Sequence, residues 1–137
     1  MRFLVDTNII SELSRPRPNS LVSARYTENF GEIAIASVTW HELLYGLHRL
    51  PSSRRKEELR NFLYQVVRPD VFILDYGEAE AEWFADERAR LTQIGRTPDY
   101  ADGQIAAIAA TNNLILVTRN ISDYADFAGL TIENWFS

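Results

Sequence analysis

The sequence contains no cysteine, and this absence removes several classes of protein at once. Without thiols the chain can form no disulfide scaffold, no thiolate zinc site and no cysteine nucleophile. Lysine is also scarce, because Lys56 is the only one and every other basic side chain apart from histidine is arginine. The planar guanidinium group of arginine matches phosphate well, although a charged run is more often solvated surface.

Long apolar runs are absent as well. The N-terminal run Phe3–Val5 is too short for a secretion signal, and no later segment approaches the length of a membrane span. We therefore expect a cytoplasmic protein without membrane contacts. The chain has 137 residues, of which 46% are hydrophobic and 24% are charged, and these are values of an ordinary globular domain. The one linker-like stretch, Ser14–Asn19, lies too near the start to separate domains, so residues 1–137 are predicted to form one domain.

Charge is unevenly distributed. The net charge of −5 argues mildly against a protein that coats nucleic acid, because such proteins usually carry a positive surface. A basic run consists of Arg49, Arg54, Arg55, Lys56 and Arg60, and an acidic run of Glu78, Glu80, Glu82, Asp86 and Glu87. We interpret both runs mainly as exposed helix faces.

Short apolar runs alternate with longer segments of helical periodicity. The predicted strands are Arg2–Val5, Glu32–Ala36, Val71–Leu74, Leu114–Val117 and Leu130–Glu133. The predicted helices are Val38–Leu50, Arg55–Val67, Glu78–Ile94 and Pro98–Thr111. Strands separated by such helices form βαβ units, so we predict an α/β fold whose mainly parallel sheet of about five strands has helices on both faces. Pro51–Ser53 separates two helices without a strand and indicates a helical hairpin.

Acidic residues lie where apolar runs meet polar residues. Asp6 follows the first predicted strand, Glu42 follows the second, Asp102 opens the apolar run Ile105–Ile108 and Asp123 follows the fourth strand. The carboxyl ends of parallel strands open on one crevice, so these acids can converge there. Clustered carboxylates repel one another unless protons or cations intervene, and their oxygens are ligands that suit Mg²⁺ or Mn²⁺. The pattern predicts a metal-dependent enzyme with a phosphorylated substrate.

Three of these acids also have a purely structural interpretation. Asp6 can cap a helix that contains Ile9–Leu13, and Thr39 with Glu42 fits a capping box. Taken alone, capping is the more frequent explanation of both residues. Asp123 can belong to a turn whose helix cap is Asn120 or Ser122.

Asp102 is harder to explain structurally. Helical spacing places it on one face with Ile105, Ala106 and Ala109. Removing a carboxylate from water onto an apolar face costs on the order of several kcal/mol in desolvation, unless a positive group pairs with it. Asp99, one turn earlier, adds a second negative charge, although it also suits the first turn of a helix after Pro98. We therefore prefer a functional role for Asp102.

Four motifs together resemble the PIN-domain ribonucleases, and most closely the VapC-type toxins of prokaryotic toxin–antitoxin pairs. The matching segments are Phe3–Asn8, Ser37–Gly46, Asp102–Ala107 and Leu116–Asn120. Each segment alone is a weak signal, but four in the same order along a chain of this length are specific. Many relatives have aspartate where this chain has Asn120, so Asp123 or Asp99 is the candidate for the fourth acid.

The resemblance implies an α/β/α sandwich that forms a single PIN-like domain over residues 1–137. It implies that Asp6, Glu42 and Asp102 are catalytic and bind one or two Mg²⁺ or Mn²⁺ ions. Supporting roles are implied for Asn8, Asp99, Thr118, Asn120 and Asp123. The implied function is a metal-dependent endoribonuclease, the toxin of a pair, which leaves a 5′-phosphate and a 3′-hydroxyl. The implied partners are RNA, a cognate antitoxin and a second copy in a homodimer.

Other folds also gather acids at strand ends. Phosphatases of the haloacid-dehalogenase kind need a second aspartate two residues after the first, where this chain has Asn8. Receiver domains need a lysine late in the sheet, and Lys56 comes too early. The alternative from another functional class is a catalytically inactive PIN module that only binds RNA or protein. This alternative remains because the fourth motif has Asn120 in place of the usual aspartate.

Overall fold

Five short parallel strands form the centre of the fold. They are β1 (Phe3–Val5), β2 (Ile33–Ala36), β3 (Phe72–Leu74), β4 (Ile115–Val117) and β5 (Ile132–Glu133). In the computed structural model, which describes all of residues 1–137, the strand order is β3-β2-β1-β4-β5, and every neighbouring pair is parallel. The predicted parallel α/β sheet is confirmed, although each strand begins one or two residues later than the sequence indicated.

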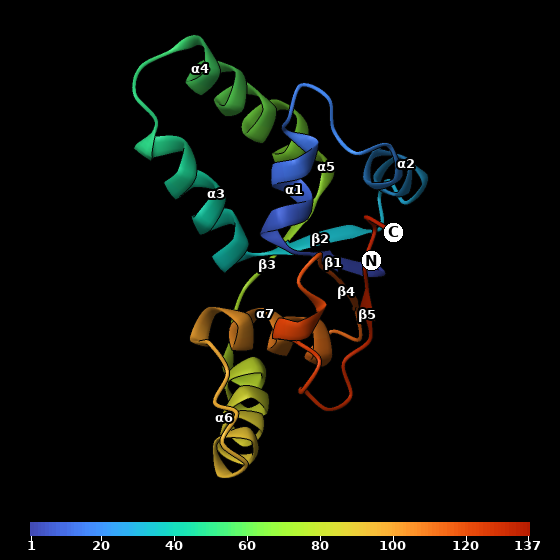
Figure 1. The fold of residues 1–137 in the computed structure, drawn as a ribbon, viewed down its shortest axis with the longest axis vertical. Helices are drawn as coiled ribbons and strands as arrows, with labels where there is room; N and C mark the ends of the chain where they lie inside the picture. Colours follow the sequence, from blue (N-terminus) through green and yellow to red (C-terminus); the bar gives the residue numbers. More distant parts are fainter.

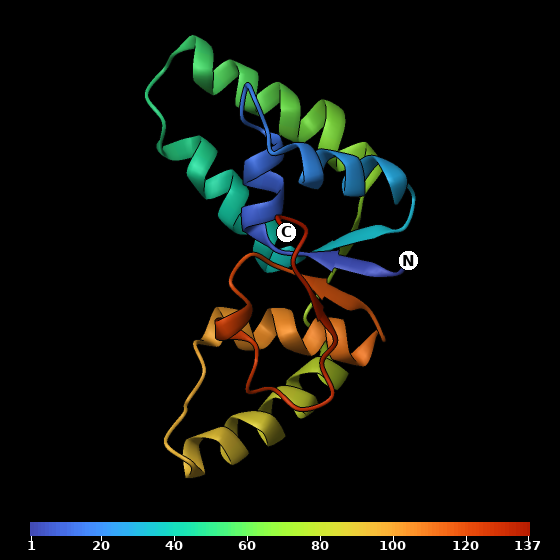
Figure 2. The same cartoon turned by 45° about the vertical axis from the view of Figure 1, so that its right-hand side comes forward.

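Helices cover both faces of this sheet. They are α1 (Thr7–Leu13), α2 (Ser20–Glu28), α3 (Ser37–Arg49), α4 (Arg54–Asn61), α5 (Arg68–Asp70), α6 (Glu78–Gln93) and α7 (Tyr100–Thr111). Figures 1 and 2 show α1 to α5 on one side of the sheet and α6 and α7 on the other, which confirms the three-layer α/β/α arrangement. No helix combines the length and the apolar character that crossing a membrane requires.

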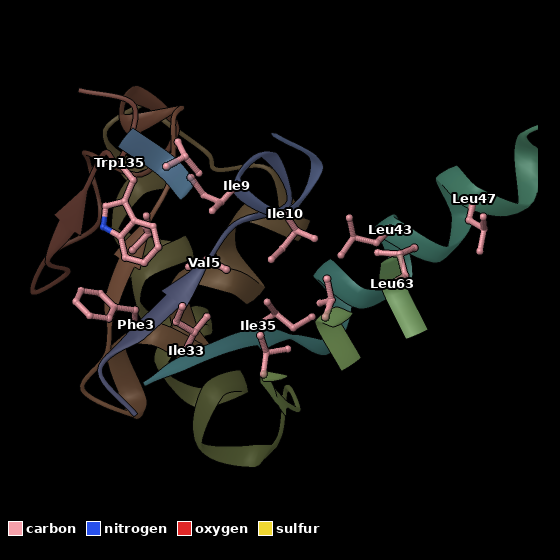
Figure 3. Close-up of a cluster of buried hydrophobic side chains, with 14 residues drawn as sticks. Phe3, Val5, Ile9, Ile10, Ile33, Ile35, Leu43, Leu47, Leu63 and Trp135 are labelled. Atoms are coloured by element: carbon pink, nitrogen blue, oxygen red, sulfur yellow. The ribbon is translucent and has the colours of Figure 1, made fainter. Parts of the chain in front are cut away.

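The alternation of side chains along the central strands divides the interior into two cores. In β1, Phe3 and Val5 point to the side of α1 to α4, whereas Leu4 between them points to the side of α6 and α7. The first core contains the larger aliphatic side chains, several of which Figure 3 labels around Val5. Because both faces are covered, β1 is buried throughout, as a central parallel strand should be.

The second core combines alanines of β2 and α7 with larger aliphatic and aromatic side chains, and α7 packs very closely on α6. Ala106, Ala107 and Ala109 of α7 are fully buried. At Gly103, an added Cβ would lie only 1.9 Å from Cζ of Phe84 in α6. This position consequently accepts no side chain unless the Phe84 ring or one of the two helices moves.

Three helix predictions need correction. The predicted helix Arg55–Val67 is regular only as far as Asn61 and continues as a π-helix over Phe62–Val67, followed by α5. Its wider turns precede Pro69, which lacks the N–H that a continuing α-helix would use. The helix α7 begins at Tyr100 instead of Pro98, and α3 begins at Ser37. The hairpin of α3 and α4 around Pro51–Ser53 is confirmed (Figure 1).

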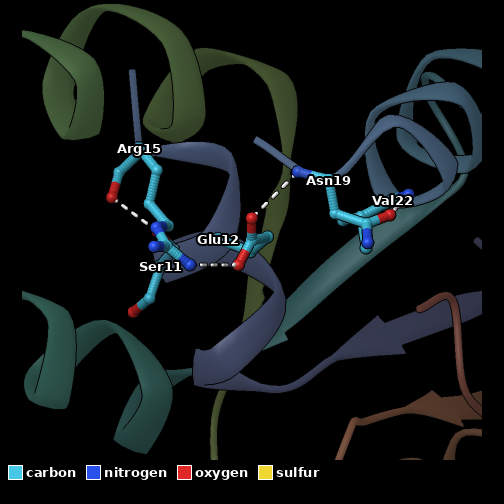
Figure 4. A network of polar contacts seen from close by, with 6 residues as sticks. Ser11, Glu12, Arg15, Asn19 and Val22 are labelled. Atoms are coloured by element: carbon cyan, nitrogen blue, oxygen red, sulfur yellow. Dashed lines mark hydrogen bonds and ion pairs between the residues drawn. The ribbon is translucent and has the colours of Figure 1, made fainter. Parts of the chain in front are cut away.

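Two buried acids outside the ends of the central strands are both neutralised by arginine. Glu12 in α1 accepts a bond from Arg15 Nη1 at 3.2 Å and from the backbone N–H of Asn19 at 2.9 Å, and so holds the segment that leads to α2 (Figure 4). Glu87 in α6 forms an ion pair with Arg90 at 2.7 Å. The interpretation of Glu87 as part of an exposed acidic face was wrong, because its side chain is buried and also accepts a bond from the backbone N–H of Ala128 at 2.7 Å.

The basic run, in contrast, lies on the surface as expected. Arg54 forms an ion pair with Glu58, and Arg60 forms one with Glu57, all within α4. Both pairs are exposed and local, so they add little to stability.

Candidate active site

The predicted acids converge on one cleft at the carboxyl end of the sheet. The cleft encloses about 400 Å³ and is lined by Asp6, Thr7, Asn8, Ser11, Glu42, Asp99, Ala101, Asp102, Ile105 and Asn120. Six of the eight residues that the sequence singled out therefore line it. Of the other two, Thr118 is buried at the end of β4, and Asp123 lines an adjoining recess together with Asp99 and Asp102.

Asp6 is the most highly coordinated acid of the cleft. One carboxylate oxygen, Oδ1, accepts a bond from the backbone N–H of Thr7 at 2.8 Å, which is the helix cap that the sequence suggested. The other oxygen, Oδ2, accepts bonds from Thr118 Oγ1 at 2.9 Å, Asn8 Nδ2 at 3.3 Å and the hydroxyl of Tyr124 at 3.3 Å. The cap and the site are thus made by the same carboxylate.

Asn8 and Thr118 join the start of α1 to the end of β4. Thr118 Oγ1 accepts bonds from Asn8 Nδ2 at 3.3 Å and from the backbone N–H of Asn120 at 3.1 Å. Asn8 Oδ1 accepts a bond from the backbone N–H of Arg119 at 3.0 Å. These bonds satisfy the polar groups at two strand ends and fix the floor of the cleft around Asp6.

Glu42 faces the cleft from α3, and its structural interpretation fails. Because α3 begins at Ser37 and its cap position is Ala36, Thr39 is not a cap and no capping box forms. The Thr39 hydroxyl is buried without a partner, and the Glu42 carboxylate instead accepts a bond from Thr7 Oγ1 at 3.4 Å. Partial desolvation raises the pKa of Glu42, and the negative charge of Asp6 raises it further.

Asp102 lies in the first turn of α7, half-buried beside the second core. The hydroxyl of Tyr124, 3.3 Å from Oδ1, is the only donor to its carboxylate. Burial raises the pKa of Asp102 to about 6, and the negative charges of Asp99 and Asp123 act in the same direction. The predicted acid on an apolar face, with no positive partner, is found here.

The remaining predicted residues surround Asp102. Asp99 is the N-cap of α7 and accepts a bond from the backbone N–H of Asp102 at 3.4 Å. The sequence had placed Asp99 in the first turn of this helix, whereas it lies one residue before the helix begins. Asn120 holds the cap position of the short 3₁₀ turn Ile121–Asp123, but its side chain makes no cap bond. Asp123 is exposed, and its charge reaches Asp102 from the adjoining recess.

Sequence reasoning missed Tyr124, which is 1% exposed and connects Asp6 to Asp102. It directly follows Asp123, in a segment that we interpreted only as a turn. The one available signal was a hydroxyl-bearing aromatic next to Asp123, and that pattern is too common to indicate a site.

The acids of the cleft have the chemistry of a divalent-cation site. None of them forms an ion pair with arginine or lysine, whereas the buried Glu12 and Glu87 elsewhere both do. The oxygens of Asp6, Glu42 and Asp102 are hard ligands of the kind that Mg²⁺ and Mn²⁺ prefer. No three carboxylate or histidine side chains already stand close enough to enclose an ion, so binding would draw the acids together.

Comparisons with known proteins agree with this geometry. The family described as PIN domain matches residues 3–129. "Ribonuclease VapC2" of Haemophilus influenzae is 31% identical, and "tRNA(fMet)-specific endonuclease VapC" of Shigella flexneri is 36% identical, each over 98% of both chains. The crystal structure of FitAcB from Neisseria gonorrhoeae superposes with a TM-score of 0.89 at 31% identity, covering 98% of both chains. The chain therefore belongs to the PIN-domain family and, within it, to the VapC ribonucleases, which confirms the resemblance.

Proposed function

We propose that the cleft hydrolyses RNA with the help of one or two Mg²⁺ or Mn²⁺ ions bound by Asp6, Glu42 and Asp102. The observation that carries this proposal is the group of carboxylates without a positive partner, in a chain whose other buried acids are paired with arginine. When bound, such a cation lowers the pKa of water, binds the scissile phosphate and offsets charge on the leaving oxygen.

The protein side chains have distinct parts in this reaction. Asp6 is held by its hydrogen bonds in one orientation, so it supplies a fixed negative charge at the floor of the cleft. Glu42 has a raised pKa and lies at the rim, where it orients the attacking water and can accept its proton. The water attacks phosphorus and the bond to the 3′-oxygen breaks, which leaves a 5′-phosphate and a 3′-hydroxyl.

Asn120 and Asp123 share the role of the usual fourth acid in this proposal. Asn120 lines the cleft, where its amide can position a water or a phosphate oxygen. Asp123 contributes charge, because it raises the pKa of Asp102 from outside the cleft. Asp99 supports both by holding the first turn of α7.

The decisive experiment is an assay of the purified protein on total RNA with Mg²⁺ and, separately, with EDTA, followed by mapping of the cleaved ends. Initiator tRNA is a first substrate to test, because the name of the Shigella relative specifies it. We expect cleavage with Mg²⁺ only, with 5′-phosphate ends. The same activity in EDTA would remove the metal from the proposal, and a complete lack of cleavage by folded protein would favour the inactive RNA-binding module.

We also propose that the protein is the toxin of a pair and that a cognate antitoxin covers this cleft. Solved relatives include VapBC from Salmonella typhimurium and FitAcB from Neisseria gonorrhoeae. A groove of about 290 Å³ adjoins the cleft and shares Thr7, Ser11 and Glu42 with it. Its other lining residues are largely aliphatic and come from α1 and from the hairpin of α3 and α4 with the π-helix that follows. An apolar segment with an arginine at one end would fit both the groove and the carboxylates.

Co-expression with the small reading frame next to the gene tests this partner. We expect a stable complex that does not cleave RNA until the partner is removed. Recovery of free protein alone would contradict the toxin–antitoxin proposal without affecting the nuclease. Light scattering of the free protein tests the proposed homodimer, whose mass would be twice the 15.7 kDa of one chain.

A further inference from the structure

Tyr124 reaches the base of the cleft from the second core. Its ring is buried and packs near Phe127, with ring centroids 6.4 Å apart. Its hydroxyl is 3.3 Å from Asp6 Oδ2 and 3.3 Å from Asp102 Oδ1. These two carboxylate oxygens are therefore no more than two hydrogen-bond lengths apart, with the phenol between them.

The two acids depend on this hydroxyl to different degrees. Asp6 keeps three other donors, from Thr7, Asn8 and Thr118, if the hydroxyl is removed. Asp102 keeps none, because no other group donates to its carboxylate. Only the phenol thus determines which oxygen of Asp102 is turned inward, and it leaves Oδ2 without a partner.

We propose that Tyr124 is a positioning residue that holds Asp102 by Oδ1, keeps Oδ2 available in the cleft and thereby sets the affinity for the divalent cation. This inference rests on the proposed metal-dependent function. Loss of a group that holds a metal ligand in place typically weakens metal affinity by about 10- to 100-fold. A phenylalanine would fill the same space and pack in the same core but could not orient the carboxylate.

The test is direct calorimetric titration of the purified full chain with Mn²⁺ alone, for wild type and for Tyr124→Phe. We expect the dissociation constant to rise about tenfold in the variant. In RNA cleavage, the Mn²⁺ concentration for half-maximal rate should rise by a similar factor, and saturating Mn²⁺ should restore most of the rate. A thermal melt of the metal-free variant should remain close to that of the control described next.

The matched control is Tyr26→Phe, because Tyr26 is a second inward-facing tyrosine whose buried hydroxyl has no hydrogen-bond partner. This control should leave Mn²⁺ affinity unchanged. Wild-type protein that bound no Mn²⁺ would remove the proposed metal-dependent function itself. Wild-type binding with equal affinity in Tyr124→Phe would overturn only the role of Tyr124. A Tyr124→Phe protein that melted far below the control would also overturn it, since it would show a structural role instead.

Discussion

At the end of β1, Asp6 accepts hydrogen bonds from Thr7, Asn8, Thr118 and Tyr124, whereas at the start of α7, Asp102 accepts one, from Tyr124. The protein itself stabilises the negative charge of the first carboxylate and leaves that of the second largely uncompensated. Hydrogen-bond donors around a carboxylate fix its orientation and stabilise its negative charge. A half-buried carboxylate with few donors is stabilised only when it binds a cation or a proton. The first region therefore contributes to the fold as well as to the site, whereas the second contributes mainly to the cation binding that we propose.

The largest expected effect is the loss of cleavage in Asp102→Asn. This substitution preserves size but removes the charge that the proposed cation needs, so RNA cleavage in Mg²⁺ should fall to the background without enzyme. The fold should remain intact or become slightly more stable, because an unpaired, half-buried charge is gone. Cleavage rates and thermal melts of the two proteins measure both effects. Wild-type activity in this variant would show that the cation site lies elsewhere.

Asp6→Asn should abolish cleavage too, but it should also weaken the fold. The amide nitrogen of asparagine would face donors such as Thr118 Oγ1 and Asn8 Nδ2, so hydrogen bonds would be lost in a buried place. We expect the free energy of unfolding to decrease by about 1–3 kcal/mol. Urea denaturation compares this variant with Asp102→Asn. Equal stability of the two variants would contradict the difference between the two regions.

Gly103→Ala probes the close packing that surrounds Asp102. The new methyl group would collide with Phe84, so overpacking should cost about 1–3 kcal/mol, less a gain of at most about 1 kcal/mol from the helix preference of alanine. Gly46→Ala in α3 is the control, because no atom lies within 4 Å of the added Cβ and the variant should be slightly stabilised. Denaturation curves of both variants measure this difference in stability. A loss of stability in Gly46→Ala would contradict the explanation by close packing at Gly103.

The stability of the metal-free protein should depend on pH through Asp102. The pKa of this carboxyl is about 6 in the folded protein and near 3.8 in the unfolded chain. Between these values the folded state holds a proton that the unfolded state has released, so the free energy of unfolding from this group falls as pH rises from about 4 to about 6. Melts in EDTA across this range should show a decline that Asp102→Asn lacks. Parallel curves for the two proteins would show that the pKa is not raised.

The smallest effect is expected at the fourth motif. Asp123→Ala removes an exposed charge that acts on Asp102, so the Mg²⁺ concentration for half-maximal cleavage should rise about two- to threefold. Stability should change little, because Asp123 caps no helix. Asn120→Asp should be tolerated and should lower the required Mg²⁺ concentration. The measurement is a Mg²⁺ titration of the cleavage rate for both variants. Unchanged metal dependence in Asp123→Ala would confine the proposed cation site to Asp6, Glu42 and Asp102.

The parts of the site that follow from local pattern were predictable. Asp6 comes directly after an apolar run, and parallel topology brings the ends of β1 and β4 together, so its position in a shared crevice could be inferred. Asp102 could be inferred because helical spacing alone places it on an apolar face. Both predictions depend on periodicities that a single sequence displays.

The parts that depend on tertiary contacts could not be inferred in this way. Tyr124 meets Asp6 across 118 positions of the chain, and no local pattern carries that information. The capping box at Thr39 failed for a different reason, because the helix begins as soon as β2 ends and Thr39 already lies inside its first turn. The π-helix at Phe62–Val67 likewise reflects how the chain meets the core, since its apolar spacing resembles that of an ordinary helix.

The distance along the chain between Asp6 and its partners also has a consequence for synthesis. Thr118 is synthesised 112 positions after Asp6, and Tyr124 is synthesised 118 positions after it. At the usual rates of translation this interval lasts about 6–24 s, during which β1 also lacks its neighbour β4. The ribosome thus adds 118 further positions after Asp6 before Tyr124 is present and the cleft can assemble.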